Sequence, residues 1–340
     1  PTSSLNFEET EKLFESIRGL CSAGIGIIFV SHRMNEVREL SDRITILRDG
    51  VVIVDGVPMS EKTDEEIVSD MLGEKLNAEE KKRKDSNAFE SSAEVLSISF
   101  DGYDGELTVK EGEIVGLAGL AGSGRSSVLR TIWGTKPRSD IHLRYLGEEY
   151  KPKNPMYALK KKIAYISEDR SESGLFFGQP IKETVLMAHR NLQRKLFVKN
   201  KSEDKLLGQI IGEVQIKVPT HECMPEALSG GNQQKLLFGR WITDEAKLLL
   251  LDEPTRGVDI KTKHEIYQRV RKMVEANNAG ALVVSSELEE LVLMCDKVLI
   301  IRDGHVEDVL TGDRITENNM MAEITASGNT KQQTEDNKSV

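Results

Sequence analysis

The chain has 340 residues, 38% apolar and 5% aromatic, which is ordinary for a globular protein of about two domains. Its net charge of -10 argues against a nucleic-acid-binding protein, whose contact face would be basic. Cys21, Cys223 and Cys295 lack the spacing of a zinc site or a disulfide framework, so we expect three buried thiols. No apolar run is long enough for a membrane-spanning helix, so any work at a membrane would be that of a peripheral partner.

An internal repeat at an offset of about 254 residues organises the chain. Residues 1–5 (PTSSL) match 254–258 (PTRGV), and each copy continues into a helical stretch and an apolar strand, at 25–30 in the first copy and 281–284 in the second. The copies then match again where ITILRDG and VLIIRDG each end in Asp-Gly, a tight strand-to-strand turn. The second copy has about 160 further residues in front of it. We therefore expect the first copy to be truncated.

Composition divides the chain into four parts. Residues 1–76 are predicted to be the C-terminal remnant of a first domain, and residues 93–327 a second, complete one. Between them, residues 77–92 are charged and without amphipathic period, which predicts a solvated linker. Residues 328–340 are polar and predict a disordered tail.

A phosphate-binding loop is predicted after the apolar strand at 113–118. The strand runs into a glycine-rich segment and then a helical pattern to Trp133, so backbone N–H groups and a helix N-terminus could surround phosphates. Arg125 stands where this pattern expects lysine, and taken alone the segment could be an ordinary glycine-rich turn. The predicted nucleotide-binding residues are Gly119, Leu120, Ala121, Gly122, Ser123, Gly124, Arg125, Ser126 and Ser127.

Two adjacent carboxylates follow the apolar run at 248–251, which predicts a parallel strand. Asp252 would hold Mg²⁺ through water, and Glu253 would polarise the attacking water. Paired acids at a strand end are commonly only solvated. The phosphate-loop pattern upstream, with a Ser126 hydroxyl suited to Mg²⁺, favours the catalytic interpretation.

The segment LSGGNQQK lies 17 residues before Asp252, and at this point the sequence resembles the ABC ATPase family. The resemblance implies that this signature contacts the γ-phosphate of an ATP held by an opposing domain, as an anion at a helix N-terminus. The signature residues are Leu228, Ser229, Gly230, Gly231, Asn232 and Gln233.

Further roles are implied by the same resemblance. Glu168 stands where the family has its Q-loop glutamine and would join Ser126 and Asp252 at the metal, and 257–259 resembles the D-loop. His32 would be the switch histidine of the first domain and, with Glu253, catalytic; in the second domain that position is Ser286. Phe100 and Tyr103 are candidates for the adenine-stacking aromatic, and neither position matches well.

The motifs GSGR, ISEDR, LSGGNQQK, DEPTRGVD and SSELEEL together resemble the ATP-binding subunit of monosaccharide importers, over about residues 1 to 325. The resemblance implies ATP and Mg²⁺ as cofactors and a peripheral place on the cytoplasmic face of the membrane. The implied partners are transmembrane permease subunits, a periplasmic or lipid-anchored sugar-binding protein reached through them, and a second ATPase domain packed head to tail; no nucleic acid is expected. We expect this chain alone to hydrolyse ATP weakly or not at all.

The resemblance implies an α/β P-loop fold with a mostly parallel sheet, an antiparallel subdomain and a helical subdomain at about 154–229 that carries the signature. Import of a related solute, such as a nucleoside or a furanosyl signal, remains open. So do a twin-ATPase without a transport role and a nucleotide-dependent regulator. A neighbouring gene for a multi-span permease would distinguish the importer from the last two.

Overall fold

The computed structural model describes residues 2, 7–31, 33–48, 50–73, 86–193, 200–218, 220–241 and 246–326. The chain divides into two compact units. The first consists of Pro1–Lys82 and Gly257–His264, and the second of Arg83–Arg256 and Glu265–Val340. No helix in the described ranges is both long and apolar enough to span a bilayer.

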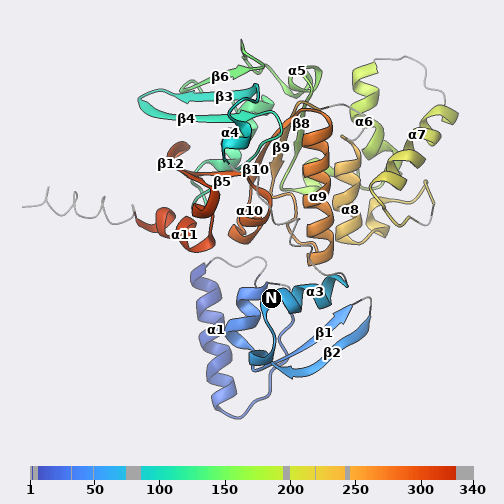
Figure 1. The fold of residues 1–340 in the computed structure, drawn as a ribbon. Helices are drawn as coiled ribbons and strands as arrows, with labels where there is room; N and C mark the ends of the chain where they lie inside the picture. The colour runs from blue at the N-terminus through green and yellow to red at the C-terminus, as the bar shows by residue number, and fades with distance from the viewer. Residues whose placement is uncertain are drawn as a thin grey trace, which may run out of the picture. The chain divides into compact units, whose positions relative to one another are not determined.

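The first unit is built on a two-stranded antiparallel sheet. Its small core gathers Met34, Ile44, Ile46, Met59 and Ile67, all buried. A capping box formed by Thr63 and Glu66 begins its last helix. In chain order the elements are α1 (Phe7–Ser22), α2 (Met34–Leu40), β1 (Arg43–Arg48), β2 (Val51–Pro58), η1 (Met59–Glu61) and α3 (Asp64–Leu72) (Figure 1).

The predicted strand at 25–30 is absent: this segment has no regular structure. Ile28 is 95% exposed and Val30 is 80% exposed. An apolar strand of this kind pairs with parallel neighbours along its edges and is buried because helices cover both faces of the sheet. In the described part of this unit the two strands pair with each other, so the segment has no such neighbours.

A six-stranded sheet forms the centre of the second unit, in the order β12-β11-β5-β10-β9-β8. All neighbours are parallel except β11 and β12, which form an antiparallel hairpin. Every residue of β5, β9 and β10 is buried, and apart from Asp252 at the end of β9 these strands are continuous apolar runs, as is typical of parallel strands buried on both faces. The strands are β5 (Ile114–Ala118), β8 (Ile163–Ile166), β9 (Leu248–Asp252), β10 (Gly280–Val284), β11 (Lys297–Arg302) and β12 (His305–Thr311).

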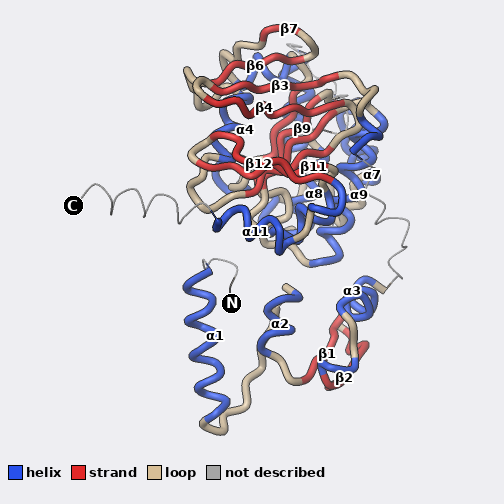
Figure 2. The backbone as a smooth tube through the Cα atoms, turned by 60° about the vertical axis from the view of Figure 1, so that its left-hand side comes forward, coloured by secondary structure: helices blue, strands red, loops and turns tan. Residues whose placement is uncertain are grey.

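A four-stranded antiparallel sheet, in the order β4-β3-β6-β7, completes the α/β part of this unit. In Figure 2 its strands lie above those of the six-stranded sheet. Both sheets contribute to one large hydrophobic core, which includes Leu96, Leu107, Leu250 and Leu282. The strands are β3 (Glu94–Phe100), β4 (Tyr103–Lys110), β6 (Ile141–Tyr145) and β7 (Glu148–Glu149).

Three helices of the second unit form a separate group. Figure 1 shows α6, α7 and α8 gathered at one side of the unit, away from β3, β4 and β6, and they share a separate core that includes Ile181, Leu207 and Leu236. The elements are η2 (Ser86–Phe89), α4 (Arg125–Trp133), α5 (Pro155–Lys160), η3 (Arg170–Gly174), α6 (Ile181–Gln193), α7 (Asn200–Glu213), η4 (Pro225–Ala227), α8 (Gly230–Gly239), α9 (Ile260–Ala276), α10 (Leu288–Met294), η5 (Gly312–Arg314) and α11 (Glu317–Ala326).

The structure confirms the predicted fold class: a mostly parallel sheet, an antiparallel sheet and a helical part. The predicted range of the helical subdomain, 154–229, needs correction. Residues 163–166 form β8 of the parallel sheet, because this apolar run pairs with β9. The separate helical core draws on residues 175–237.

Two further expectations meet different outcomes. Cys295 is buried as expected, but Cys223 is only partly buried and Cys21 is exposed, so the prediction of three buried thiols was wrong. The predicted disordered tail lies outside the described residues, as do residues 77–85 of the predicted linker; residues 86–89 of that linker form η2.

Candidate functional site

The predicted phosphate loop lies between β5 and α4. Gly124 is the N-cap of α4 and has φ +95°, a backbone conformation that residues with a Cβ rarely adopt. The loop therefore ends at a helix N-terminus, where backbone N–H groups and the helix dipole favour an anion.

The turn of the β11–β12 hairpin supports this loop. Asp303 and Gly304 both have positive φ, as a two-residue hairpin turn requires. The Gly304 N–H donates to the Ser123 carbonyl over 2.7 Å, and Arg138 donates to the Gly304 carbonyl over 3.1 Å while paired with Asp140. The predicted Asp-Gly turn is therefore confirmed, and it packs on the backbone of the phosphate loop.

Ser126 and Asp252, which are 126 positions apart in the sequence, lie in contact in the structure. The Ser126 hydroxyl donates to Oδ1 of Asp252 over 2.7 Å, and the Tyr165 hydroxyl donates to Oδ2 over 3.0 Å. Asp252 is fully buried, and burial raises the pKa of its carboxyl, whereas the two hydrogen bonds lower it. A buried carboxylate beside a hydroxyl is an oxygen donor set that suits Mg²⁺.

Arg125, the residue in place of the expected lysine, donates a hydrogen bond to a backbone carbonyl. Its Nη1 donates to the Ser285 carbonyl over 2.7 Å, at the end of β10. Burial lowers the pKa of the guanidinium, while Glu253 and Asp252 act in the opposite direction. The positive charge remains near the loop, but its planar group is held by a carbonyl.

Glu253 follows β9 in an unusual conformation, with φ +51°. Its N–H donates to the Val284 carbonyl over 2.9 Å, and its Oε2 accepts from the Ser286 hydroxyl over 3.0 Å. Ser286, which was expected to stand at the switch-histidine position, therefore contacts the carboxylate predicted to be catalytic. Burial raises the pKa of Glu253, and the bonds from Ser286 lower it.

Glu253→Gln is expected to raise the free energy of unfolding at pH 8 by about 1 kcal/mol, because the neutral amide removes a charge that burial disfavours; gains of this size are common for stabilising substitutions. The folded-state pKa of Glu253 lies above its ordinary value of 4.5, so stability from this group is full below pH 4.5 and is lost as pH rises through the folded pKa. The difference between variant and parent should therefore shrink towards pH 4.5. Urea unfolding at several pH values measures the difference in free energy of unfolding between variant and parent. A variant that is less stable than the parent at pH 8 would contradict the prediction.

Glu168 takes a different partner from the one expected. Its carboxylate forms an ion pair with Arg256, in the segment that follows Glu253. The predicted metal-binding residues are thus not all joined: Ser126 and Asp252 bond to each other, and the carboxylate of Glu168 is engaged elsewhere.

The signature segment begins α8. The Ser229 side chain caps the helix by accepting from the Asn232 N–H over 3.4 Å. Arg170 donates to the Gly230 carbonyl over 2.8 Å, and Gln233 donates to the Pro225 carbonyl over 3.0 Å. The segment is therefore held by neighbours in the region that contains the helical core, and it presents a capped helix N-terminus.

Three other predicted residues complete the comparison. His32 lies outside the described residues. Phe100, a candidate for stacking on adenine, is 3% exposed and meets the ring of His305 edge-on, with centroids 5.5 Å apart, so its ring is part of the core. The side chain of Tyr103, the other candidate, is not described.

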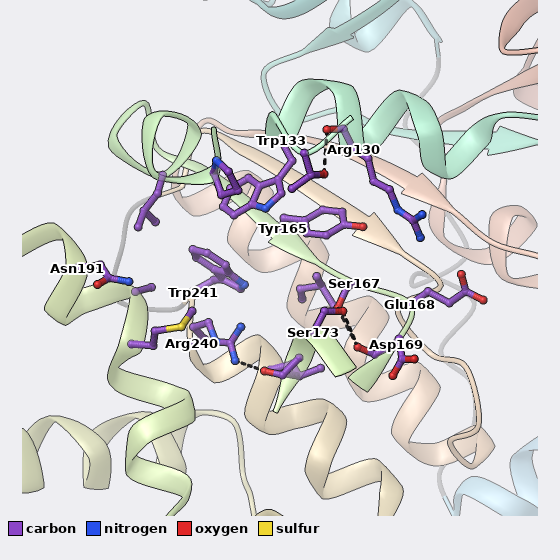
Figure 3. Close-up of a pocket in the computed structure, with 18 of the residues that line it drawn as sticks. Arg130, Trp133, Tyr165, Ser167, Glu168, Asp169, Ser173, Asn191, Arg240 and Trp241 are labelled. Carbon is purple, nitrogen blue, oxygen red and sulfur yellow. Dashed lines mark hydrogen bonds between the residues drawn. The ribbon is translucent and has the colours of Figure 1, made fainter. Parts of the chain in front are cut away.

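A pocket of about 530 Å³ opens beside the site, between α4, α5 and β8 on one side and α6 and α8 on the other. Figure 3 shows Trp133, Tyr165 and Trp241 inside it and Glu168 and Asp169 along it. Sequence reasoning missed Tyr165 and Arg130 as neighbours of Asp252. The available signal was the position of Tyr165 in the strand paired with β9, where Tyr165 lies opposite Leu250.

Comparisons with known proteins agree with this geometry. Residues 104–256 match the family model described as ABC transporter. The chain is 35% identical to a putative ribose/galactose/methyl galactoside import ATP-binding protein of Albidiferax ferrireducens, over 95% of the chain and 64% of the relative. It is also 35% identical to a ribose import ATP-binding protein, RbsA, of Bacillus subtilis, over 94% of the chain and 65% of the relative. The chain thus spans about two thirds of the length of these relatives.

Solved structures show the same fold at lower identity. A dimeric ATP-binding cassette bound to ADP and Pi is 19% identical, with a TM-score of 0.54, and covers 64% of this chain and 98% of its own. CbiO1 from Clostridium perfringens, part of an ABC transporter complex, is 18% identical, with a TM-score of 0.55, and covers 69% of this chain and 96% of its own. The predicted P-loop fold of the ABC type is therefore confirmed, and residues 104–256 form a domain that matches the ABC transporter family model.

Proposed function

We propose that this chain belongs to the ATP-binding subunit that energises import of a monosaccharide through an ABC transporter. The observation that carries the proposal is the Ser126–Asp252 pair at the end of a phosphate loop in an ABC-family domain. The curated relatives quoted above are named as sugar import ATP-binding proteins, which supports the substrate class.

The residues of the second unit have distinct roles in this proposal. The backbone of 119–127 surrounds the phosphates of ATP at the N-terminus of α4. Ser126 and Asp252 hold Mg²⁺, which neutralises charge that develops on the phosphates. Glu253 orients the attacking water from its strained position at the end of β9.

The signature residues 228–233 act on a different ATP. Ser229 and the N-terminus of α8 contact the γ-phosphate of the nucleotide held by the opposing domain, to which His32 also contributes. The two domains close on ATP head to tail and separate after hydrolysis. In the same proposal, residues 1–76 belong to the first ATPase domain, residues 77–92 are the linker and residues 93–327 are the second domain.

The site built on this chain's phosphate loop should hydrolyse ATP poorly, because Arg125 is held by the Ser285 carbonyl and Ser286 replaces a histidine. Arg125→Lys combined with Ser286→His is expected to raise steady-state phosphate release in the assembled transporter by about 10²-fold, the usual effect of one preorganised charge-stabilising group. The single variants are the controls. Turnover that stays at the parent level in the double variant would sink the unequal-site idea.

The partners follow from the substrate class. Permease subunits would dock where α6 and α8 border the pocket, and a sugar-binding protein would act through the permease. The subunit would then lie peripherally on the cytoplasmic face of the membrane.

Sugar uptake by cells that lack the gene tests the proposed function. Uptake of labelled ribose, galactose or xylose should fall to background for at least one sugar and return with the intact gene. Undiminished uptake of all three, with loss of uptake of a labelled nucleoside, would move the assignment to the related-solute importer.

A further inference from the structure

Three aromatic rings form a series through the pocket described above. Trp241 meets Trp133 edge-on, with centroids 6.1 Å apart, and Trp133 stacks on Tyr165 at 5.6 Å with an interplanar angle of 25°. These rings come from α4, from β8 and from the residue pair after α8, so the series joins the helical part to the sheet. Trp133 and Trp241 are the two tryptophans of the chain, so its tryptophan emission arises from this pocket.

The hydroxyl of Tyr165, at the end of this series, contacts the candidate metal site. It donates to Oδ2 of Asp252 over 3.0 Å, and Figure 3 shows it pointing towards the guanidinium of Arg130. A phenolic hydroxyl carries its proton at neutral pH, so Tyr165 donates to the carboxylate.

The two oxygens of Asp252 consequently have different neighbours. Oδ1 accepts from Ser126, whereas Oδ2 accepts from Tyr165 and has Nη2 of Arg130 at 4.0 Å. A fully buried carboxylate that is fixed through one oxygen presents the other in a defined direction. Oδ1 is therefore the oxygen turned towards the phosphate loop.

We propose that Tyr165 is a positioning residue that fixes Asp252 for Mg–nucleotide binding and links that carboxylate to the two tryptophans of the pocket. The inference rests on the proposed function, since it concerns the same Mg²⁺–ATP site. A Mg²⁺ ion held by Ser126 and Asp252 would replace the bond between them and alter the hydrogen bond from Tyr165, whose ring stacks on Trp133.

Tyr165→Phe tests the inference, because it keeps the stacked ring and removes only the hydroxyl. ATP binding by the full chain is measured as a function of Mg²⁺ concentration, by calorimetry and by tryptophan emission in parallel. The variant should need about 10-fold more Mg²⁺ for half-maximal binding, the usual effect of losing a group that orients a metal ligand. Its tryptophan emission should no longer respond when Mg–ATP binds.

The matched control is Tyr157→Phe, whose ring stacks on Tyr150 at 5.8 Å, and it should behave as the parent in both readouts. Trp241→Phe leaves Trp133 as the single reporter and should keep the emission change. Arg130→Gln, at a side chain 46% exposed, gives a second variant if Tyr165→Phe does not fold, and it should also need more Mg²⁺ than the parent for half-maximal binding.

The outcomes separate the inference from the proposed function. Parent-like Mg²⁺ dependence together with a parent-like emission change in Tyr165→Phe would overturn the inference and leave the proposed function intact. A parent chain that binds no ATP at any Mg²⁺ concentration would overturn both.

Discussion

Gly124→Ala is expected to lower the free energy of unfolding by about 3 kcal/mol and to abolish ATP binding. A Cβ at this position would lie 2.8 Å from the Cα of Gly304 and would sit on a residue with φ +95°. The atoms that this Cβ would meet belong to the backbone of Gly304, so they cannot move away as a flexible side chain could. Backbone strain and overpacking each contribute about 1 to 3 kcal/mol. Urea unfolding and calorimetric titration with ATP measure the two effects.

Gly122→Ala is the matched control for this prediction. Gly122 also has positive φ, at +82°, but nothing lies within 4 Å of a Cβ placed there. Its substitution carries backbone strain alone and should lower the free energy of unfolding by about 1 kcal/mol. Equal losses in the two variants would show that the hairpin turn does not brace the loop.

Asp252→Asn is expected to weaken Mg²⁺-dependent ATP binding by about 100-fold or more without loss of the fold. The amide keeps an oxygen for Ser126 or Tyr165 but removes the charge that Mg²⁺ requires, and even groups one step further from a metal contribute 10- to 100-fold. Titration with ATP at fixed Mg²⁺ concentrations gives the affinity.

Thermal unfolding provides the control for this variant. Burial disfavours the charged form of Asp252, so the neutral amide should unfold no earlier than the parent in the absence of nucleotide. A folded variant with parent-like Mg²⁺ dependence would mean that Asp252 does not hold the metal.

Much of the second unit could be predicted because its signals are local. The runs at 114–118, 248–251 and 280–284 are apolar throughout, as is typical of strands buried on both faces, and all three lie in parallel strands of one sheet. The Asp-Gly turn at 303–304 needed only the preference for positive φ. The glycines and the paired acids then indicated the site by motif.

The remaining features depend on partners that are distant in sequence. Residues 25–30 have the apolar character of a strand, but a strand also needs neighbours, which the described part of the first unit does not supply. The contact between Tyr165 and Asp252, which are 87 positions apart, depends on the pairing of β8 with β9. The ion pair between Glu168 and Arg256 likewise joins two loops whose proximity no pattern in either segment indicates.

The most direct test of the central claim is ATP binding and steady-state hydrolysis by this chain, with Mg²⁺ and with a chelator. The account predicts Mg²⁺-dependent binding at one site with little phosphate release, because Ser126 and Asp252 can hold the metal while Arg125 and Ser286 do not complete the chemistry. Brisk hydrolysis by the chain alone, or the absence of Mg²⁺-dependent binding, would contradict it.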